Sequence, residues 1–466
     1  MTSQKSFCVH AHFYQPSRED PLTGEIPFEV GADPYDNWNE KIFAGCYAPN
    51  ADIGNFRKIS FNLGPTLTRW MRAKQPQTLA KIVAADRENI ASFGVGNAMA
   101  QPYHHTILPL ATRREKRIQV AWGIADFVRT FDRMPEGMWL PETAVDLETL
   151  DVLAEFGIKF TILAPWQADG ILPDPFQPYH VTTSYDRDIT VFFYDSGLSS
   201  DISFNPGATV NADGFASKFV HPRFDHTAKP EMLMVASDGE LYGHHQAFRE
   251  KFLARLLDGA LRQEGVEPSY PALWLRRNPI SQTIRIREQT SWSCHHGVQR
   301  WKDQCGCTPE GSWKKPLRDA MNTIAGMIDS AFEAYAGQFV SDPWKCVEAY
   351  SAVILDRVSA DEWLEQHSCT SLDIDRKMHL KSLFEAQVER HRMFTSCGWF
   401  FDDFDRIEPR NNVAYAAHAV WLAERAAEID LYAEAIKAFK PVVSAKSGLK
   451  GDEVFSSAFY RFSNRS

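Results

Sequence analysis

Glu142 and Asp238 are the two side chains whose type and setting best fit a catalytic pair. Glu142 stands in Trp139-Leu-Pro-Glu-Thr-Ala and Asp238 in Leu233-Met-Val-Ala-Ser-Asp-Gly, so each carboxyl follows a short apolar run and precedes a helical pattern. Cleavage of a glycosidic bond needs one carboxylate to attack or stabilise the anomeric carbon and one carboxylic acid to protonate the leaving oxygen. The pair therefore predicts glycosidic chemistry, with a candidate for each role.

The elements that must position this pair follow an alternating pattern. Over about the first 300 residues, short β-rich runs alternate with helical stretches, which is typical of βα units around a parallel sheet. Barrel enzymes recruit catalytic groups from the carboxyl ends of their strands, so we expect seven or eight strands to close an α/β barrel. The candidate strands are Ser6–His12, Ile90–Gly94, Gly137–Leu140, Phe160–Leu163, Thr190–Tyr194, Met232–Ala236 and Pro271–Leu275.

Polar residues at the ends of these runs favour a common barrel mouth. They are His10, His12, Asn97, Glu142, Asp195 and Asp238. A crossover helix is expected directly after Glu142, because Asp146 is a candidate N-cap, Leu residues follow at helical spacing and Gly157 ends the pattern. We therefore expect Glu142 in a strand-to-helix loop.

From about Lys314 the pattern changes to long amphipathic stretches with few strand signals. These stretches are Leu317–Phe339, Leu372–Arg392 and Asn412–Ile429. The sequence thus predicts a barrel domain over residues 1–310 and a helical C-terminal domain over residues 311–466. No Gly/Ser tether separates the two, so we expect them to pack together. For Ser447–Ser466 the sequence gives no clear prediction.

Four ordered segments carry a resemblance to a known family. His10-Ala-His12-Phe-Tyr-Gln15-Pro comes first, and the alternation of strand side chains places its two His on one face. The later segments are His105-Thr-Ile-Leu-Pro-Leu, Trp139-Leu-Pro-Glu142 and Asp238-Gly-Glu-Leu-Tyr-Gly. In this order they resemble the motifs of glycoside hydrolase family 57, over roughly residues 5–420 and closest to a poorly characterised branch.

The resemblance implies an incomplete (β/α)7 barrel followed by a helical domain, and a retaining mechanism on α-glycosidic bonds, with α-glucans such as glycogen, starch or maltooligosaccharides as expected substrates. Glu142 matches the nucleophile of the family and Asp238 its general acid/base. The expected substrate-binding residues are His10, His12, Gln15, His105, Trp139, Glu240, His244, Trp292 and Trp399. No cofactor or metal is expected.

Two departures from the family pattern bear on specificity. Phe13 and Tyr14 stand between His12 and Gln15, which could reposition Gln15. The family's Ser-Asp-Trp-aromatic cluster has its nearest equivalent in Ser396-Cys-Gly-Trp399-Phe-Phe-Asp. Hydrolysis and transglycosylation use the same intermediate, so the catalytic pair leaves the choice between them open.

Composition and charge narrow the expected partners. The net charge of −10 argues against nucleic acid and acidic membranes, both of which favour clustered Lys and Arg. The N-terminus lacks the apolar stretch of a secretory signal, and no apolar run reaches the length of a transmembrane helix. With 8 Cys among 466 residues, a cytoplasmic protein with reduced thiols and a carbohydrate ligand is expected, its oligomeric state left open.

Two other functions remain open. His10, His12, His105 and Asp238 could hold the metal of an amidohydrolase-type barrel enzyme, although the Trp139-Leu-Pro-Glu142 segment would then have no role. A catalytically silent carbohydrate-binding protein could keep the barrel, although retention of both carboxyls counts against it.

The segment Cys294-His-His-Gly-Val-Gln-Arg-Trp-Lys-Asp-Gln-Cys305-Gly-Cys307 invites a zinc interpretation. Its spacing lacks the paired Cys-x-x-Cys of a zinc finger, and Cys-x-Cys is a strained chelate. A structural or substrate-lining loop is therefore expected, with Trp292 and Trp301 flanking the cleft.

Overall fold

The computed structural model describes residues 4–170, 172–224 and 229–464. The chain forms two compact units, of which the first comprises Met1–Gln15, Phe28–Gln101 and Phe127–Trp292. The second comprises Pro16–Pro27, Pro102–Asp126 and Ser293–Ser466. Two segments from the first half of the sequence thus belong to the same unit as the C-terminal helices.

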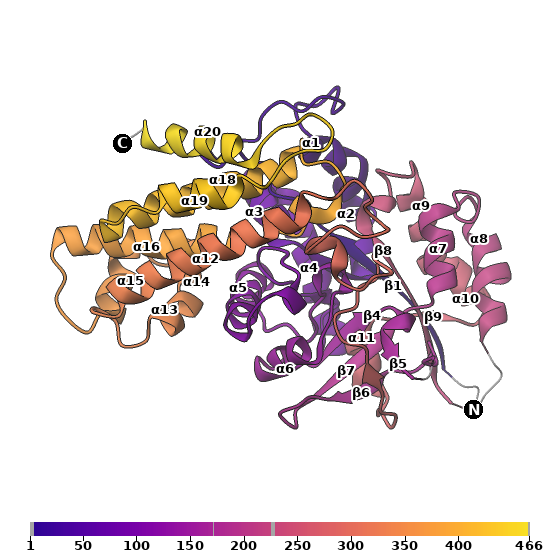
Figure 1. Cartoon of the computed structure of the whole chain (residues 1–466). Helices are drawn as coiled ribbons and strands as arrows, with labels where there is room; N and C mark the ends of the chain where they lie inside the picture. The colour runs from indigo at the N-terminus through magenta and orange to yellow at the C-terminus, as the bar shows by residue number, and fades with distance from the viewer. Residues whose placement is uncertain (1–3, 171, 225–228, 465–466) are drawn as a thin grey trace. The chain divides into compact units, whose positions relative to one another are not determined.

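A parallel sheet forms the centre of the first unit (Figure 1). Strand β1 (Lys5–Phe13) lies between β2 (Ser60–Leu63) and β8 (Glu231–Asp238), and both pairings are parallel. β2 pairs in parallel with β3 (Ala98–Met99), and β9 (Glu267–Pro268) pairs with the start of β1. Residues 6–13 of β1 are all buried, as expected of a strand that has neighbours on both edges and is covered on both faces.

A second group of strands continues this arrangement. β4 (Phe160–Leu163) pairs in parallel with β7 (Asp188–Phe193), which pairs antiparallel with β6 (Tyr179–Thr182). Single parallel bridges join Ala100 to Met138 and Gly137 to Phe160, and the Asp195 N–H donates to the Met234 carbonyl at 2.7 Å. A short antiparallel pair is formed by β5 (Ala168–Asp169) and β10 (Arg285–Ile286).

Alternate residues of several strands meet in one apolar core within the first unit. β4 contributes Phe160 and Ile162, and β8 contributes Met232, Met234 and Ala236, as the two-residue period of strand side chains requires. Cys8, Trp139, Phe192 and Trp274 belong to the same cluster. The expected strands β1, β4, β7 and β8 are confirmed, and so is the α/β class with a parallel sheet.

Helices connect these strands. The predicted crossover helix is α6 (Leu147–Glu155), and the Asp146 side chain caps it by accepting from the Thr149 N–H at 2.7 Å. The other α-helices that lie wholly within this unit are α1 (Trp38–Ile42), α2 (Ala48–Asp52), α3 (Pro65–Lys74), α4 (Pro76–Phe93), α7 (Ser196–Phe204), α8 (Ala212–Phe215), α9 (Arg249–Arg255), α10 (Leu261–Gln263) and α11 (Pro271–Arg277).

Two of the expected strands are wrong. Ile90–Gly94 lies at the end of α4, where Leu79, Ile82 and Ile90 continue one helical pattern that Gly94 ends at φ 74°. Pro271–Leu275 lies in α11, whose first residue is Pro271. Proline suits the first turn of a helix because the N–H it lacks would have no partner there.

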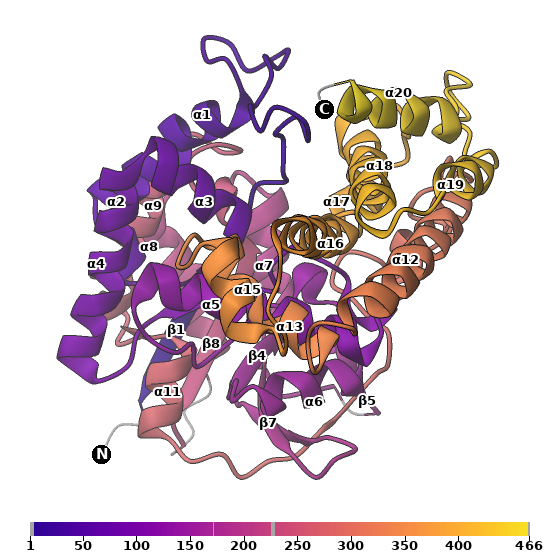
Figure 2. The ribbon, with the colours of Figure 1, turned by 90° about the vertical axis from the view of Figure 1, so that its left-hand side faces the viewer.

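Long helices build the second unit. α12 (Lys314–Ala336), α16 (Ile374–Arg392) and α18 (Ile407–Ala427) pack against one another, and α20 (Gly451–Ser463) packs on α18 (Figures 1 and 2). The three helices expected from Leu317, Leu372 and Asn412 are confirmed to within a few residues. The shorter helices are α13 (Pro343–Ala349), α14 (Ser351–Ile354), α15 (Ala360–His367), α17 (Cys397–Phe400) and α19 (Tyr432–Phe439).

Buried charges tie the 102–126 segment to these helices. Arg390 on α16 forms ion pairs with Asp329 of α12 and with Glu115 of α5 (Arg113–Phe131). The Trp122 indole N–H donates to the Val347 carbonyl at 3.0 Å. Among the described residues, no helix combines the length and the apolar character that crossing a membrane requires.

Candidate active site

Glu142 stands on a strained turn that Trp292 supports. It lies in the short 3-10 segment Pro141–Thr143, where Glu142 and Thr143 have φ of 58° and 47°. A left-handed backbone costs a non-glycine residue about 1–3 kcal/mol, so surrounding contacts must hold it. The Trp292 indole N–H donates to the Glu142 carboxylate at 3.0 Å, and its backbone N–H donates to the Glu142 carbonyl at 3.0 Å. Gln167 holds the next residue by donating to the Thr143 carbonyl at 2.8 Å.

Asp238 is the last residue of β8, and the parallel register places it beside His12 of β1. Its side chain is exposed, yet the protein around it still removes enough water to raise its pKa from 3.8 to about 6. A general acid/base works best when its pKa lies near the working pH. Asp238 therefore has the properties of a group that can give up and regain a proton near neutrality.

Glu240 forms a buried hydrogen-bond network with Tyr47 and with the two residues that directly follow β1. Its Oε1 accepts from the Tyr47 hydroxyl at 2.6 Å and from the Tyr14 N–H at 3.2 Å, and the Gln15 amide donates to the Tyr47 oxygen at 2.8 Å. Burial, reinforced by the charge of Asp238, raises the pKa of Glu240 from 4.5 to about 8. Tyr14 thus holds Glu240 directly and Gln15 holds it through Tyr47, so Tyr14, one of the two additional residues after His12, has a structural role.

Gly239 is required between the two acidic residues, because a Cβ there would clash with the Phe13 ring. The Asp238-Gly-Glu sequence therefore packs closely against the end of β1. Phe13, the other residue inserted into the first motif, sets this fit.

We expect Glu240→Gln to stabilise the protein at about pH 8 and to change stability little at about pH 5. Because folding raises the pKa of Glu240, the folded state favours the protonated carboxyl. The stabilisation that comes from the protonated carboxyl is complete below the pKa that Glu240 has in the unfolded chain. It is lost as the pH rises from there through about 8, the pKa in the folded protein. Glutamine is neutral throughout and can still accept from Tyr47. Thermal unfolding of both proteins across this range measures the effect.

The matched control for this variant is Asp319→Asn, which removes an exposed carboxylate that is paired with Lys315 on α12. Its stability relative to the wild type should not rise with pH. A Glu240→Gln difference that is the same at both ends of the pH range would mean that Glu240 is ionised in the folded protein.

His10 and His12 are buried, and burial lowers their pKa values to about 3 and about 4. Both rings are therefore neutral near pH 7. Nδ1 of His10 lies 2.9 Å from the Ser60 hydroxyl, and Nδ1 of His12 lies 3.1 Å from the Asn62 amide oxygen. Trp139 stacks on both rings, with centroids at 4.5 Å and 5.3 Å. The two histidines thus have fixed orientations and no charge.

Several buried polar atoms of this unit lack a hydrogen-bond partner among the described residues. They include Nε2 of His10, Oε1 of Gln15, Nε2 of Gln101 and Nε1 of Trp139. Buried polar atoms almost always have a partner, so a group of exceptions calls for an explanation. A polar ligand such as a sugar, which offers both donors and acceptors, would provide the missing partners.

Aromatic rings extend from Trp139 to the surface. Trp292 meets Trp139 edge to face at 5.1 Å, Tyr194 meets Trp292 at 6.4 Å, and Trp166 meets Tyr194 at 6.2 Å. Trp166 is 39% exposed. The sequence patterns did not indicate Tyr47 or Trp166, and they marked Tyr194 as the end of an expected strand. Tyr194 directly follows β7, and Trp166 lies three residues after the end of β4.

The other predicted residues have local partners. His244 is half-buried and meets Trp38 edge to face at 6.0 Å, and desolvation lowers its pKa to about 4. Asn97 donates to the Phe56 and Ile59 carbonyls just before β3, so it supports the fold at the amino end of that strand. Asp195 caps α7 and pairs with Arg223 at 2.7 Å, which is also a structural role.

His105 and Trp399 belong to the second unit. Nδ1 of His105 lies 2.6 Å from the Ser396 hydroxyl, and the Ser396 N–H donates to the His105 carbonyl at 3.1 Å. Trp399 has no exposed surface, and its ring packs against the Arg318 guanidinium at 4.3 Å. These are the contacts of a core tryptophan.

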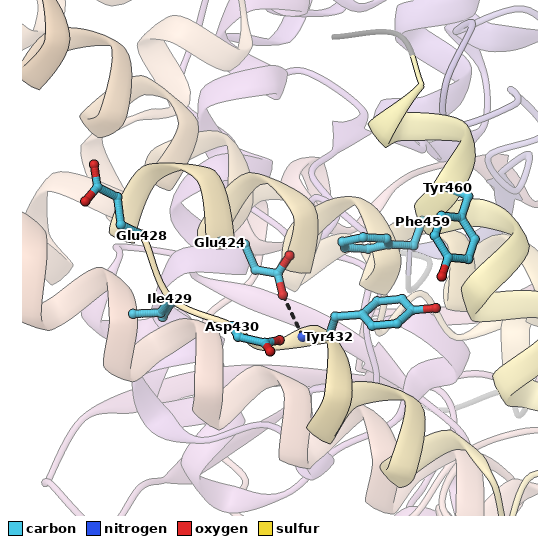
Figure 3. A pocket seen from close by; sticks show the side chains of 7 residues that line it. All are labelled: Glu424, Glu428, Ile429, Asp430, Tyr432, Phe459 and Tyr460. Atoms are coloured by element: carbon cyan, nitrogen blue, oxygen red, sulfur yellow. Dashed lines mark hydrogen bonds between the residues drawn. The ribbon is translucent and has the colours of Figure 1, made fainter.

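A shallow surface pocket of about 400 Å³ lies in the second unit between the end of α18 and helices α19 and α20 (Figure 3). Glu424 accepts from the N–H groups of Leu431 and Tyr432 at 2.7 Å and 2.6 Å, so this carboxylate caps the start of α19. The pocket is lined by Glu424, Glu428, Ile429, Asp430, Tyr432, Phe459 and Tyr460. Because the Glu424 carboxylate caps a helix, we assign this pocket no catalytic pair.

One group of potential metal ligands occurs in the described ranges. It consists of Cys294, His296, Cys305 and Cys307, all in the second unit. His10, His12 and Asp238 form no such group within the same ranges. Their arrangement therefore offers no support for the amidohydrolase alternative.

Two family models match the chain. One, described as "Glycosyl hydrolase family 57", matches residues 24–287, and the other, described as "Domain of unknown function (DUF3536)", matches residues 310–460. Alpha-amylase 1 of Dictyoglomus thermophilum is 21% identical over an alignment of 275 residues, which covers 56% of this chain and 36% of that protein. The chain thus spans about a third of the length of this curated relative.

Two solved structures share the fold. An exo-type maltose-forming amylase from Pyrococcus sp. ST04 has 16% identity and a TM-score of 0.73, with 97% of this chain and 88% of that chain covered. A branching enzyme from Pyrococcus horikoshii has 15% identity and a TM-score of 0.63, with 96% and 98% covered. At these identities the likeness concerns the fold alone. The first family model, however, covers more than half of the 466 residues, and the chain belongs to glycosyl hydrolase family 57.

Proposed function

We propose that this protein is a retaining glycoside hydrolase or transglycosylase that acts on α-glycosidic bonds of α-glucans. Glu142 is the nucleophile and Asp238 the general acid/base. The observation that carries the proposal is the difference between their settings. Glu142 accepts a hydrogen bond from the Trp292 indole N–H, whereas desolvation raises the pKa of Asp238 to about 6.

The finer architecture that we propose for the first unit is an incomplete (β/α)7 barrel. The parallel pairings of β3–β2–β1–β8, the bridges at Ala100–Met138 and Gly137–Phe160, the β4–β7 pair and the Asp195–Met234 hydrogen bond support it. Their shared core of alternate residues also supports it. In such a barrel both carboxyls stand at carboxyl ends of strands, where barrel enzymes place their chemistry.

The proposed reaction is a double displacement. The Asp238 carboxylic acid gives its proton to the glycosidic oxygen as the bond from that oxygen to the anomeric carbon breaks, and a Glu142 carboxylate oxygen bonds to that carbon. Asp238, now ionised, then takes a proton from water or from a sugar hydroxyl, whose oxygen displaces Glu142 from the anomeric carbon. We expect carboxyl groups about 5–5.5 Å apart when substrate is bound.

The proposed sugar-binding residues lie around this pair in the first unit. His10, Gln15 and Trp139 provide the unpartnered polar atoms, and Trp292 provides a half-buried ring. His12, Glu240 and His244 complete the set, and Trp166 adds an exposed ring on which a further sugar can stack. For His105 and Trp399, which belong to the second unit, a contact with the sugar stays a prediction. The protein is proposed to work in the cytoplasm, where thiols stay reduced, and the described residues contain no disulfide.

Purified protein incubated with maltooligosaccharides or glycogen, and compared with Glu142→Gln, tests this function. Products resolved by size should become shorter if the enzyme hydrolyses, or form a ladder of longer chains if it transfers, and neither should appear with the variant. Activity on amides or esters that needs an added divalent metal, with none on glucans, would favour the amidohydrolase alternative. Glucan binding without any turnover would identify a silent binder.

A further inference from the structure

We propose that Cys294, His296, Cys305 and Cys307 bind one structural zinc ion. Their ligand atoms, three sulfurs and an imidazole nitrogen, lie within 4.8 Å of one another, and all four residues belong to the second unit. The cluster lies outside both matched ranges, residues 24–287 and 310–460. Neither carboxyl of the proposed reaction is among its residues.

The distances between the ligand atoms fit a tetrahedral ion. With Zn–S bonds of about 2.3 Å and Zn–N bonds of about 2.0–2.1 Å, a tetrahedron places two sulfurs about 3.8 Å apart and a sulfur and a nitrogen about 3.6 Å apart. The Cys294 and Cys305 sulfurs are 3.9 Å apart. Nδ1 of His296 lies 4.0 Å from the Cys294 sulfur and 3.5 Å from the Cys307 sulfur. A central ion can therefore reach all four atoms with small adjustments.

Two tight turns present the ligands. The Gly297 N–H donates to the Cys294 carbonyl at 3.1 Å, and the Thr308 N–H donates to the Cys305 carbonyl at 2.9 Å. Gly306, between the second and third cysteines, leaves room for the imidazole, since a Cβ there would lie 3.1 Å from Cε1 of His296. The Cys-x-Cys pair thus contributes to the site together with a His from the other turn.

A buried cation complements the charge of the occupied site. Zn²⁺ with three thiolates and a neutral imidazole carries one net negative charge. Lys314, which has no exposed surface, donates at 3.2 Å to the carbonyl of Arg300, in the loop between Cys294 and Cys305, and at 2.6 Å to the carbonyl of Trp399. Four protein ligands leave no open position, so the ion would stabilise structure rather than activate water.

A disulfide is the main competing use of these cysteines. The sulfurs of Cys294 and Cys305 are 3.9 Å apart, about twice the length of a disulfide bond of about 2.05 Å. A disulfide would also leave His296 and Cys307 without a role in the cluster.

Zinc analysis of the reduced full-length protein tests the proposal. The protein is stripped with a chelator, titrated with Zn²⁺ alone and freed of weakly bound metal. The wild type should retain one zinc per chain and unfold at a higher temperature than the stripped form. Cys305→Ser and Cys307→Ser should lose this zinc, whereas Cys369→Ser should keep it, because Cys369 is an exposed cysteine outside the cluster.

Co²⁺ added to the stripped wild type provides a readout that does not depend on the folding of any variant. The visible absorption of tetrahedral cobalt together with a thiolate-to-cobalt charge-transfer band would support the site. The proposal fails if the reduced wild type retains no zinc, if Cys305→Ser retains as much as Cys369→Ser, or if the protein isolated under reducing conditions contains a Cys294–Cys305 disulfide.

Discussion

Replacing Glu142 with Gln is expected to lower glucan turnover by about four orders of magnitude, which corresponds to about 5 kcal/mol of lost transition-state stabilisation. An amide is a poor nucleophile, and its neutral oxygen cannot offset the positive charge that develops at the anomeric carbon. The fold should persist, since the amide oxygen of the new side chain can still accept from the Trp292 indole N–H, which is 3.0 Å from the native carboxylate. Steady-state kinetics with maltooligosaccharides and a thermal unfolding curve measure both effects.

Azide separates a lost nucleophile from a general loss of activity. With an α-maltosyl fluoride substrate and Glu142→Ala, whose short side chain leaves room beside the anomeric carbon, azide can attack that carbon directly. The product should then be the β-maltosyl azide, which has the inverted configuration. The matched control is Trp292→Phe, which keeps an aromatic ring at this position and leaves Glu142 unchanged but removes the indole N–H donor. It should reduce turnover far less and should form no such azide. Near-normal turnover by Glu142→Gln would remove Glu142 from its proposed role.

The sequence located the strands with strong local patterns. β4 matches its predicted range of Phe160–Leu163, and β1, β7 and β8 match within two residues. It missed β2, whose four residues alternate polar and apolar side chains although every position is buried, because so short a run gives only a weak pattern. The two false strands were short apolar runs inside helices, and a run of that length cannot distinguish a strand from a buried helical segment.

Chain order also limited the prediction of compact units. The segments Pro16–Pro27 and Pro102–Asp126 belong to the second unit although they precede most strands of the first. What holds Pro102–Asp126 there is tertiary, namely the Glu115–Arg390 ion pair and the Trp122–Val347 hydrogen bond. No local pattern reports partners that are more than two hundred residues away in sequence.

The sequence indicated the carboxyls of the candidate site more readily than the side chains that support them. The sequence indicated both carboxyls and His12, and the parallel register confirms that His12 and Asp238 are neighbours. It could not indicate Tyr47, which reaches Glu240 from a helix 193 positions earlier. For the cysteine cluster, a rule based on paired cysteines overlooked His296, because it considers spacing along the chain and not the meeting of two turns.

Asp238→Asn is expected to abolish activity on glucans while sparing the first step with substrates whose leaving group needs no proton. Fluoride is such a group, so α-maltosyl fluoride should give a burst of one fluoride per enzyme, followed by slow release of the intermediate. In the wild type, kcat/KM on glucans should fall as the pH rises above about 6, because Asp238 must be protonated to act as the acid and its pKa is about 6. With the fluoride substrate, kcat/KM should not fall over this pH range.

Glu240 provides the sharpest comparison for this assignment, because it is the other carboxyl whose raised pKa would allow it to act as the acid. If Asp238 is the acid, azide should accelerate the Asp238→Asn reaction and give the α-azide, since the intermediate on Glu142 is attacked with a second inversion. With Glu240→Gln, kcat/KM on glucans should still fall above about pH 6, and azide should not accelerate the reaction. A different result would exchange the roles of the two carboxyls. In that case Glu240→Gln would lose the acid function, and the kcat/KM of the wild type would fall only near pH 8, the pKa of Glu240. Glu240 would then donate the proton, and the charge of Asp238 would help to raise the pKa of Glu240.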